Sequence, residues 1–261
     1  MVRALLVLAL VITASARKPL PKAHAHNDYE HKRPLLDALE HGFCGVEADI
    51  YLVDGELLVG HDRKDLKPGR TLRKLYLDPL RKRVKANKGQ IYGGIKTEFT
   101  LLIDIKSDGK QTYHALSKVL SEYKEILTGT QDGVTTKRAV TVIISGNRAK
   151  EKIVDDNPRY AGIDGRLEDL ESGLNKHLLP LISDNWSKHF KWKGEGEMPA
   201  EERQKLQAIV KQAHAVGRSV RFWATPEKVA VWRELQAAGV DLINTDDLPG
   251  LRRFLSEDSL N

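Results

Sequence analysis

The sequence predicts an α/β protein built as a single (β/α)8 barrel of the TIM type, and three observations support this prediction. From His24 onward, eight short apolar runs typical of β-strands alternate with helix-like stretches. Alternating strands and helices form parallel sheets, and eight such repeats close a sheet into a barrel. The 261 residues contain no low-complexity linker, and a barrel of this type typically has about 250 residues.

Residues 1–16 are expected to form a signal peptide that is not part of the barrel. Met1–Arg3 is a short basic start, Ala4–Ile12 is an unbroken apolar run, and Ala14–Ala16 supplies the small residues of a cleavage site. The apolar run is too short to span a bilayer, although an uncleaved anchor is the alternative. The predicted domains are a signal peptide over 1–16 and a barrel over 17–261, in a protein exported to the periplasm or secreted.

Composition limits the partners and the covalent chemistry of the chain. Cys44 is the single cysteine, so no intramolecular disulfide can form. Hydrophobic residues make up 41% of the chain, which is enough for one core. The net charge of +6 favours anionic substrates. No nucleic-acid partner is expected.

The predicted strands are short and rich in apolar and β-branched residues. A further run, Glu56–Gly60, follows the turn signal Asp54-Gly55, so it is predicted to form a hairpin with the second strand. The eight barrel strands are predicted at Lys22–His26, Gly45–Leu52, Leu101–Ile105, Val140–Ser145, Tyr160–Asp164, Leu178–Ser183, Val220–Ala224 and Leu242–Thr245.

The predicted helices lie between these strands. Gln111–Thr128 has apolar residues at helical spacing, which buries one stripe. Asn147 is predicted to open a helix that reaches about Asp156 and is stopped by Pro158. The remaining helices are predicted at Pro34–His41, Leu72–Asn87, Leu167–Ser172, Glu201–Val216 and Thr225–Ala238.

Polar residues that end the first three strands are candidates for a metal site. Active sites of such barrels lie at the C-terminal ends of the strands. Glu47 and Asp49 are two apart on one strand and share a face, and Asp104 lies on the next barrel strand. Carboxylates inside buried apolar strands are costly unless they bind something. Oxygen-rich clusters of this kind select hard cations, so the expected ion is Ca²⁺ or Mg²⁺.

Histidines beside this cluster suit acid–base catalysis. The first strand ends in His24-Ala25-His26, and His61 ends the hairpin. Two histidines can divide proton transfer between a base and an acid, while Lys106 offsets negative charge on a substrate. Each feature also has a simpler interpretation. A strand-end histidine is often only hydrogen-bonded, the Glu47/Asp49 pair can be a solvated strand face, and Asp104 with Lys106 can be a plain ion pair.

Several segments resemble one superfamily. The G-x-x-G-V-E-x-D phrase of Gly42–Asp49, preceded by a strand-end histidine and followed by His61-Asp62, resembles the catalytic core of the phospholipase C-like phosphodiesterases. These include glycerophosphodiester phosphodiesterases and phosphatidylinositol-specific phospholipases C. LLIDIK (101–106) and GVDLINTDD (239–247) resemble two further glycerophosphodiesterase strands. The branch that the chain resembles includes a fungal mitochondrial-inheritance protein.

The resemblance implies a distorted barrel and a metal-dependent phosphoric diester hydrolase that acts on a glycerophosphodiester or a phospholipid-type substrate. Asn27 stands where glycerophosphodiesterases have the arginine of an H-R-G motif, and His24 with Asn27 also fits the H-x-x-N of sphingomyelinases D. His24 and His26 therefore compete for one catalytic role. The expected site consists of His26 and His61 as catalytic residues, of Asn27, Glu47, Asp49 and Asp104 as metal ligands, and of Lys106, His24, Arg148 and Trp223 as substrate contacts.

Two segments predict peripheral contact with an anionic membrane. Residues 63–88 are rich in lysine and arginine, and Trp186–Lys193 alternates aromatic and cationic residues. Both follow strand ends on the active-site side. A solvated helix face and a loop that packs its own aromatic rings are the alternatives.

Two other classes of protein compete with the phosphodiesterase. His24-Ala25-His26 is an H-x-H pair of the kind that opens metal sites in amidohydrolases and histidinol-phosphatase-like enzymes. Those sites need further histidines on middle strands, where this chain has Ser145, Asp164 and Ser183. The second competitor is a non-catalytic barrel that binds a lipid or a phosphosugar.

Overall fold

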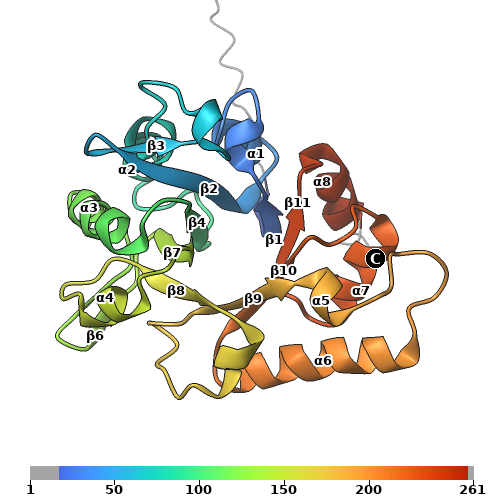
Figure 1. Cartoon of the computed structure of the whole chain (residues 1–261). Coiled ribbons are helices and arrows are strands. Elements are labelled where there is room, and N and C mark those ends of the chain that lie inside the picture. Colours follow the sequence, from blue (N-terminus) through green and yellow to red (C-terminus); the bar gives the residue numbers. More distant parts are fainter. Residues whose placement is uncertain (1–17, 258–261) are drawn as a thin grey trace, which may run out of the picture.

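The computed structural model of the chain describes residues 18–257, so the predicted signal peptide lies outside the described residues. Eight parallel strands form a closed barrel, which confirms the predicted fold class (Figure 1). Closure depends on β1, which pairs with β2 on one side and with β11 on the other. In order around the ring the strands are β1 (Leu20–Ala25), β2 (Phe43–Val53), β4 (Phe99–Ile105), β7 (Val140–Gly146), β8 (Gly162–Gly165), β9 (Leu181–Asn185), β10 (Ser219–Trp223) and β11 (Leu242–Thr245).

The interior of the barrel has an apolar layer beneath a polar layer. Leu102, Ile143, Leu181 and Leu242 form a small cluster of buried side chains that is separate from the main core. Each lies two residues before a polar residue of the same strand, and residues two apart on a strand face the same side. The polar residues at the C-terminal ends of the strands therefore stand on a closed apolar floor.

The predicted hairpin follows β2. Asp54 and Gly55 have φ values of 49° and 83°, as a two-residue turn with two left-handed positions requires, and they lead into β3 (Glu56–Val59). This strand pairs antiparallel with the end of β2, with Val59 opposite Ile50. His61 is carried back to the mouth of the barrel in this way.

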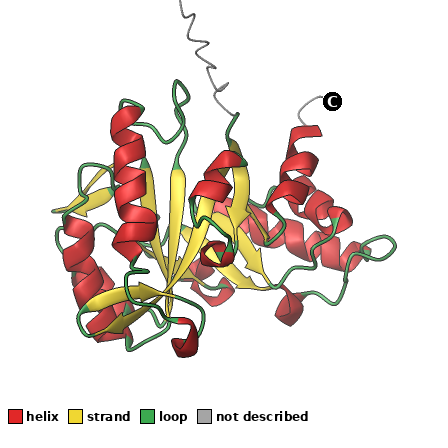
Figure 2. Cartoon of the chain, turned by 90° about the horizontal axis from the view of Figure 1, so that it is seen from above, coloured by secondary structure: helices red, strands yellow, loops and turns green. Residues whose placement is uncertain are grey.

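Helices surround the strands (Figure 2). Helix α6, below β9 and β10 in Figure 1, buries Leu206, Ile209, Val210 and Ala213 at helical spacing. The α-helices are α1 (Leu36–Glu40), α2 (Asp78–Ala86), α3 (Gly109–Ser121), α4 (Lys150–Asp155), α5 (Trp186–His189), α6 (Ala200–Ala215), α7 (Val229–Ala237) and α8 (Leu248–Glu257). Shorter helical segments are η1 (Asp28–Glu30), η2 (Arg63–Asp65), η3 (Arg73–Leu77) and η4 (Leu167–Glu171).

Several predicted boundaries are wrong. The helix predicted over 111–128 ends at Ser121, and an unpredicted hairpin of β5 (Gly129–Gln131) and β6 (Val134–Thr136) follows. Asn147 does not open a helix, because its side-chain amide donates to the carbonyl of Ser107, and α4 begins at Lys150. The helix predicted from Thr225 begins at Val229, and the one predicted at Leu167 is a short 3-10 turn.

The aromatic segment Trp186–Lys193 faces the core. Trp186, Phe190 and Trp192 are 2%, 3% and 8% exposed, and Trp186 stacks on Phe190 with ring centroids 4.1 Å apart. Buried rings cannot reach a lipid interface, so the interfacial prediction is wrong for this segment and it packs its own aromatics. Within residues 18–257 no helix combines the length and the apolar character needed to cross a membrane.

Much of the basic segment over residues 63–88 is engaged within the fold. Arg73 pairs with Glu122, Arg81 pairs with Asp78, and the Arg83 side chain donates to the carbonyl of Ile91. These guanidinium groups tie η3 and α2 to neighbouring segments. Arg63 and the lysines of the segment are exposed and carry its positive charge at the surface.

Candidate active site

Three carboxylates meet at the mouth of the barrel. Glu47 and Asp49 come from β2 and Asp104 comes from β4, and one oxygen of each lies within 4.8 Å of the others. The strand register brings them together, because Asp49 is directly opposite Asp104. Glu47 and Asp49 are buried. The predicted convergence of these residues is therefore present in the structure.

Two cations hold this cluster. The Arg221 guanidinium, from β10, lies 2.5 Å from Glu47 Oε2 and also donates to Asn244 Oδ1 at 2.7 Å. The Lys106 ammonium lies 3.1 Å from Asp49 Oδ2 and 3.4 Å from Asp104 Oδ1. Sequence reasoning missed Arg221, although a charged residue in the buried run of β10 is the same signal that singled out Glu47.

The electrostatics of the three carboxylates differ. Burial raises the pKa of Asp104 to about 6, Lys106 partly offsets this effect, and Asp49 adds to it. Burial and the charge of Glu47 also raise the pKa of Asp49. Burial opposes ionisation of Glu47 as well, but the charge of Arg221 together with the contributions of His24 and His26 outweighs burial and lowers the pKa of Glu47. Ionising all three carboxylates together is therefore costly without further positive charge.

The cluster can hold a divalent metal ion. Asp49 Oδ1 and Asp104 Oδ1 are buried and accept no hydrogen bond from the described residues, although Asp104 Oδ1 has the 3.4 Å ion pair with Lys106. Unpartnered buried oxygens are rare in native proteins. A cation bound by Glu47, Asp49 and Asp104 would satisfy both oxygens and offset the excess negative charge.

Replacing Arg221 tests how the negative charge of the carboxylate cluster is compensated. Replacing Arg221 with methionine leaves Glu47 buried without its guanidinium partner, and breaking a buried pair in this way costs about 3–5 kcal/mol. Arg203, which pairs with Glu234 at 2.8 Å on the partly exposed face of α6, is the matched control. We expect Arg203→Met to cost less than about 1 kcal/mol. Urea unfolding measures both, and equal losses would contradict a special role for Arg221.

His26 follows β1 directly and is held by a carboxylate. Its Nδ1 lies 2.9 Å from Asp246 Oδ1, and its backbone N–H donates to the carbonyl of Thr245. Burial lowers the pKa of His26, but the hydrogen bond to Asp246 and the charge of Glu47 outweigh burial, and the net shift is upward. The carboxylate acceptor keeps a proton on Nδ1 and leaves Nε2 for the mouth of the barrel. Asp246 is part of the GVDLINTDD segment, but sequence reasoning gave it no role.

His61 lies on the other side of the cluster. Its Nδ1 is 3.1 Å from Asp49 Oδ2 and 3.0 Å from the hydroxyl of Tyr29. The same hydroxyl lies 2.8 Å from Asp49 Oδ2 and 2.8 Å from Asn27 Oδ1. Tyr29 thus links His61, Asp49 and Asn27. Sequence reasoning gave Tyr29 no role, although it lies two residues after Asn27, a predicted metal ligand.

His24 does not contact the open site. Its side chain is fully buried, and Nε2 lies 3.9 Å from Glu47 Oε2, behind the carboxylate cluster. Burial lowers the pKa of His24 to about 4, so the ring is neutral at physiological pH. The predicted substrate contact from His24 is therefore wrong, because the ring has no exposed surface. His26 has 28% of its side chain exposed.

A second polar group forms the opposite wall of the mouth. Asp164, at the end of β8, accepts from Ser145 at 2.7 Å and from Arg166 at 2.8 Å. Arg166 also lies over the ring of Trp223 at 4.6 Å, and Arg148 donates to the carbonyl of Asp164. Arg148 and Trp223, both predicted as substrate contacts, are brought to this wall. The positive charge of Arg166 adds to burial in lowering the pKa of Arg148.

Within the described residues, the group of side chains close enough to share one metal ion consists of the three carboxylates and includes no histidine. An H-x-H metal site would need both histidines of the first strand to face the ion. Instead His24 lies behind Glu47, and His26 is turned toward Asp246. The geometry therefore favours the phosphodiesterase over the amidohydrolase class.

A closed barrel with three carboxylates and two flanking histidines at its C-terminal mouth fits a glycerophosphodiesterase-like barrel, and comparison with known families agrees. The AIM6-like phosphodiesterase domain matches residues 15–163, and the glycerophosphoryl diester phosphodiesterase family matches residues 219–249. The chain belongs to the family of AIM6-like phosphodiesterase domains.

Curated relatives are fungal proteins of the same family. The altered inheritance of mitochondria protein 6 of Eremothecium gossypii is 31% identical over 270 residues, which cover 90% of this chain and 69% of the relative. A homologue from Arthroderma benhamiae is 31% identical over 266 residues, which cover 90% of this chain and 84% of the relative. These relatives are named for inheritance and not for a reaction.

Solved structures share the fold. A glycerophosphodiester phosphodiesterase from Agrobacterium tumefaciens has a TM-score of 0.56 at 16% identity and covers 91% of this chain and 100% of its own. The corresponding enzyme from Parabacteroides distasonis has a TM-score of 0.54 at 18% identity, and the match covers 93% of this chain and 100% of that enzyme. An Oleispira antarctica phosphodiesterase has a TM-score of 0.53 at 17% identity, and the match covers 91% of this chain and 97% of that phosphodiesterase. At these identities the likeness supports the fold alone.

Proposed function

We propose that this protein is a Ca²⁺- or Mg²⁺-dependent phosphoric diester hydrolase that acts on a glycerophosphodiester or a phospholipid-type substrate. The observation that carries the proposal is the carboxylate cluster of Glu47, Asp49 and Asp104, flanked by His26 on one side and His61 on the other. General acid–base catalysis of diester cleavage needs a proton acceptor and a proton donor on opposite sides of the reacting phosphorus.

Glu47, Asp49 and Asp104 would hold the ion, and the Asn27 amide oxygen is available as a fourth ligand. When bound, the ion would polarise the phosphoryl oxygen and lower the pKa of the attacking hydroxyl. All other roles fall to side chains of this chain. Lys106 offsets negative charge on the phosphate, since its ammonium already lies between Asp49 and Asp104.

The two histidines divide the proton transfer. Asp246 holds His26 through Nδ1, and Asp49 with Tyr29 holds His61 through its own Nδ1. Each ring therefore turns Nε2 toward the substrate. One ring takes the proton of the attacking hydroxyl, and the other gives a proton to the leaving oxygen. The carboxylate and hydroxyl partners fix the orientation of both rings before the substrate arrives.

The wall of Arg148, Arg166 and Trp223 is suited to the anionic or polar part of the substrate beyond the scissile phosphate. Guanidinium groups bind phosphate and carboxylate well. We expect Arg148→Ala to raise KM by about tenfold or more with a smaller effect on kcat, because a hydrogen bond to a charged group contributes about 1.5–3 kcal/mol. Arg233→Ala, on the exposed face of α7, is the control. An unchanged KM in Arg148→Ala would remove this wall from substrate binding.

Glycerophosphodiesters are the first substrates to test. The related Oleispira antarctica phosphodiesterase was solved in complex with the product sn-glycerol-3-phosphate. A panel of glycerophosphodiesters, phosphoinositides and lysophospholipids, supplied with Ca²⁺ or Mg²⁺ and followed by phosphorus NMR, identifies the substrate from its products. A monoester product indicates attack by water, and a cyclic phosphate indicates attack by a hydroxyl of the substrate. Binding without turnover of any member would favour a non-catalytic barrel.

Export and membrane contact stay predictions. The first rests on residues 1–16 and the second on the exposed lysines of residues 63–88. Mass spectrometry of the mature N-terminus tests the first. Flotation with anionic vesicles at low and high salt tests the second, because attraction to a charged surface falls off within about 10 Å at 0.1 M salt.

A further inference from the structure

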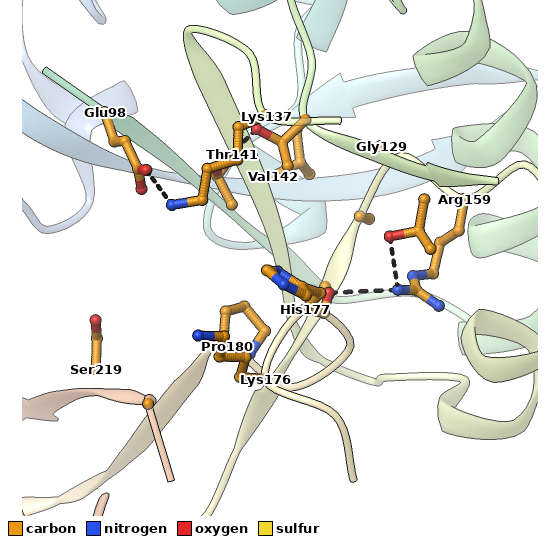
Figure 3. Close-up of a pocket in the computed structure, with 15 residues that line it drawn as sticks. Glu98, Gly129, Lys137, Thr141, Val142, Arg159, Lys176, His177, Pro180 and Ser219 are labelled. Carbon is orange, nitrogen blue, oxygen red and sulfur yellow. Dashed lines mark hydrogen bonds and ion pairs between the residues drawn. The ribbon is translucent and has the colours of Figure 1, made fainter. Parts of the chain in front are cut away.

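A second polar cavity lies at the opposite end of the barrel from the candidate active site (Figure 3). It opens among the first residues of β7, β8 and β10, and Pro180 just before β9 lines it as well. Its volume is about 230 Å³. Pockets that hold drug-sized ligands have volumes of roughly 300–1,000 Å³, so this cavity suits a small ligand.

One wall of the cavity carries a buried arginine that forms no ion pair with a described carboxylate. Arg159 is only 8% exposed, and its Nη2 donates to Thr130 Oγ1 and to the carbonyl of His177, each at 3.3 Å. Among residues 18–257 no carboxylate forms an ion pair with this guanidinium. Burial lowers the pKa of Arg159, and the charges of Tyr113 and Asp156, which form no ion pair with it, partly offset this effect. Buried charges are normally paired, so this cation is short of one negative partner.

The other charged residues of the cavity leave it positive. Lys137, Lys176 and His177 line it together with Arg159, and Glu98 is the one carboxylate among the lining residues. Glu98 is already engaged by Lys137 at 2.5 Å. Figure 3 shows the His177 ring between Arg159 and the residues around Pro180. The pKa of His177 is lowered, first by burial and then by the charges of Lys176, Lys137 and Arg159.

We propose that this cavity is a second, non-catalytic site that binds a small phosphate-type anion. Arg159 supplies a guanidinium of the kind that pairs with phosphate oxygens, and Lys176 supplies a second charge from the rim. The hydroxyl of Ser219 lies in the same lining and can add a hydrogen bond. A phosphate dianion is compact and needs several donors, which matches a small cavity with more donors than acceptors.

The test uses metal-free full-length protein and inorganic phosphate as the probe. Ring signals of the histidines, followed by proton–nitrogen NMR, separate the two ends of the barrel, since His177 reports on this cavity and His26 and His61 report on the mouth. We expect phosphate to shift the His177 signals in a saturable way. Lys176→Glu, which changes an exposed residue, should weaken this binding at least tenfold, and Lys211→Glu on α6 should leave it unchanged.

Arg159→Gln should abolish the saturable shift of His177 in protein that still shows a cooperative thermal transition. Shifts confined to His26 and His61, or full affinity at His177 in Lys176→Glu, would overturn the proposal. The source of the anion is decided by vesicles of phosphatidic acid compared with phosphatidylcholine. If the protein sediments with phosphatidic acid vesicles but not with phosphatidylcholine vesicles, and Lys176→Glu abolishes this, the anion is a lipid head group. If the protein sediments with neither kind of vesicle, the anion is a soluble phosphate.

Discussion

Replacing Asp104 with asparagine is expected to lower turnover of the diester by about 10²–10³, because metal-ion stabilisation contributes several kcal/mol and each 1.36 kcal/mol is a factor of ten in rate. The substitution keeps the shape of the side chain and removes one anionic ligand. Asp104 has few other contacts to lose, since its side chain pairs with Lys106 at 3.4 Å. The fold should therefore survive. The rate and the metal concentration at half-maximal activity are the two quantities to measure.

Asp108→Asn is the matched control for this prediction. Asp108 follows the same strand, is exposed, and caps α3 by accepting from the backbone N–H of Gln111 at 2.9 Å. Asparagine caps a helix about as well as aspartate, so stability and rate should both be close to wild type. If Asp104→Asn retained the rate and the metal requirement of the parent, Asp104 would not be a ligand.

Removing the imidazole of His26 is expected to lower kcat by about 10²–10⁴, the usual contribution of general acid–base catalysis. The effect of Asp246→Asn should be in the same direction and smaller in size. An amide in place of the carboxylate can turn its N–H₂ toward Nδ1, which favours the wrong tautomer of His26 and tilts the ring. Steady-state kinetics should show a loss in kcat with KM nearly unchanged.

Asp247→Asn is the control for this pair, because Asp247 is adjacent in sequence but accepts from Gly250 N–H at 2.9 Å and serves the start of α8. Its kcat should match that of the parent.

His24→Ala decides whether His24 or His26 is the catalytic histidine of the first strand. We expect it to reduce stability, since a buried ring leaves a cavity, and to cost less in kcat than His26→Ala. A folded but inactive His24→Ala, next to an active His26→Ala, would make His24 the catalytic residue.

The barrel could be predicted from the sequence because its signal is local. Each strand is a short apolar run, and the alternation with helices repeats eight times. The carboxylates could also be predicted, since a spacing of two on β2 and one parallel neighbour place Glu47, Asp49 and Asp104 on the same face. Boundaries were less predictable. Asn147 suits a helix N-terminus locally, yet its side chain is used by the carbonyl of Ser107 in a different loop.

The partners of the site residues could not be predicted, because they depend on closure of the ring. Arg221 is 174 positions from Glu47, and Asp246 is 220 positions from His26, so only the register of β10, β11 and β1 brings them together. The interfacial prediction for the aromatic segment was wrong for a related reason. Alternation of rings and cations in Trp186–Lys193 does not reveal which side faces inward. That direction is set by contacts with Phe222 of β10.

Metal dependence is the central claim, and turnover of a glycerophosphodiester by chelator-treated protein tests it most directly. The rate is measured by phosphorus NMR after removal of metal with EDTA, and again after addition of Mg²⁺ or Ca²⁺, with the metal content of the protein determined in parallel. The cluster of three carboxylates, in which the buried Asp49 Oδ1 has no hydrogen-bond partner among the described residues, predicts no turnover without metal and recovery on addition of one of the two ions. Full turnover in excess EDTA, by protein that contains no metal, would contradict the account.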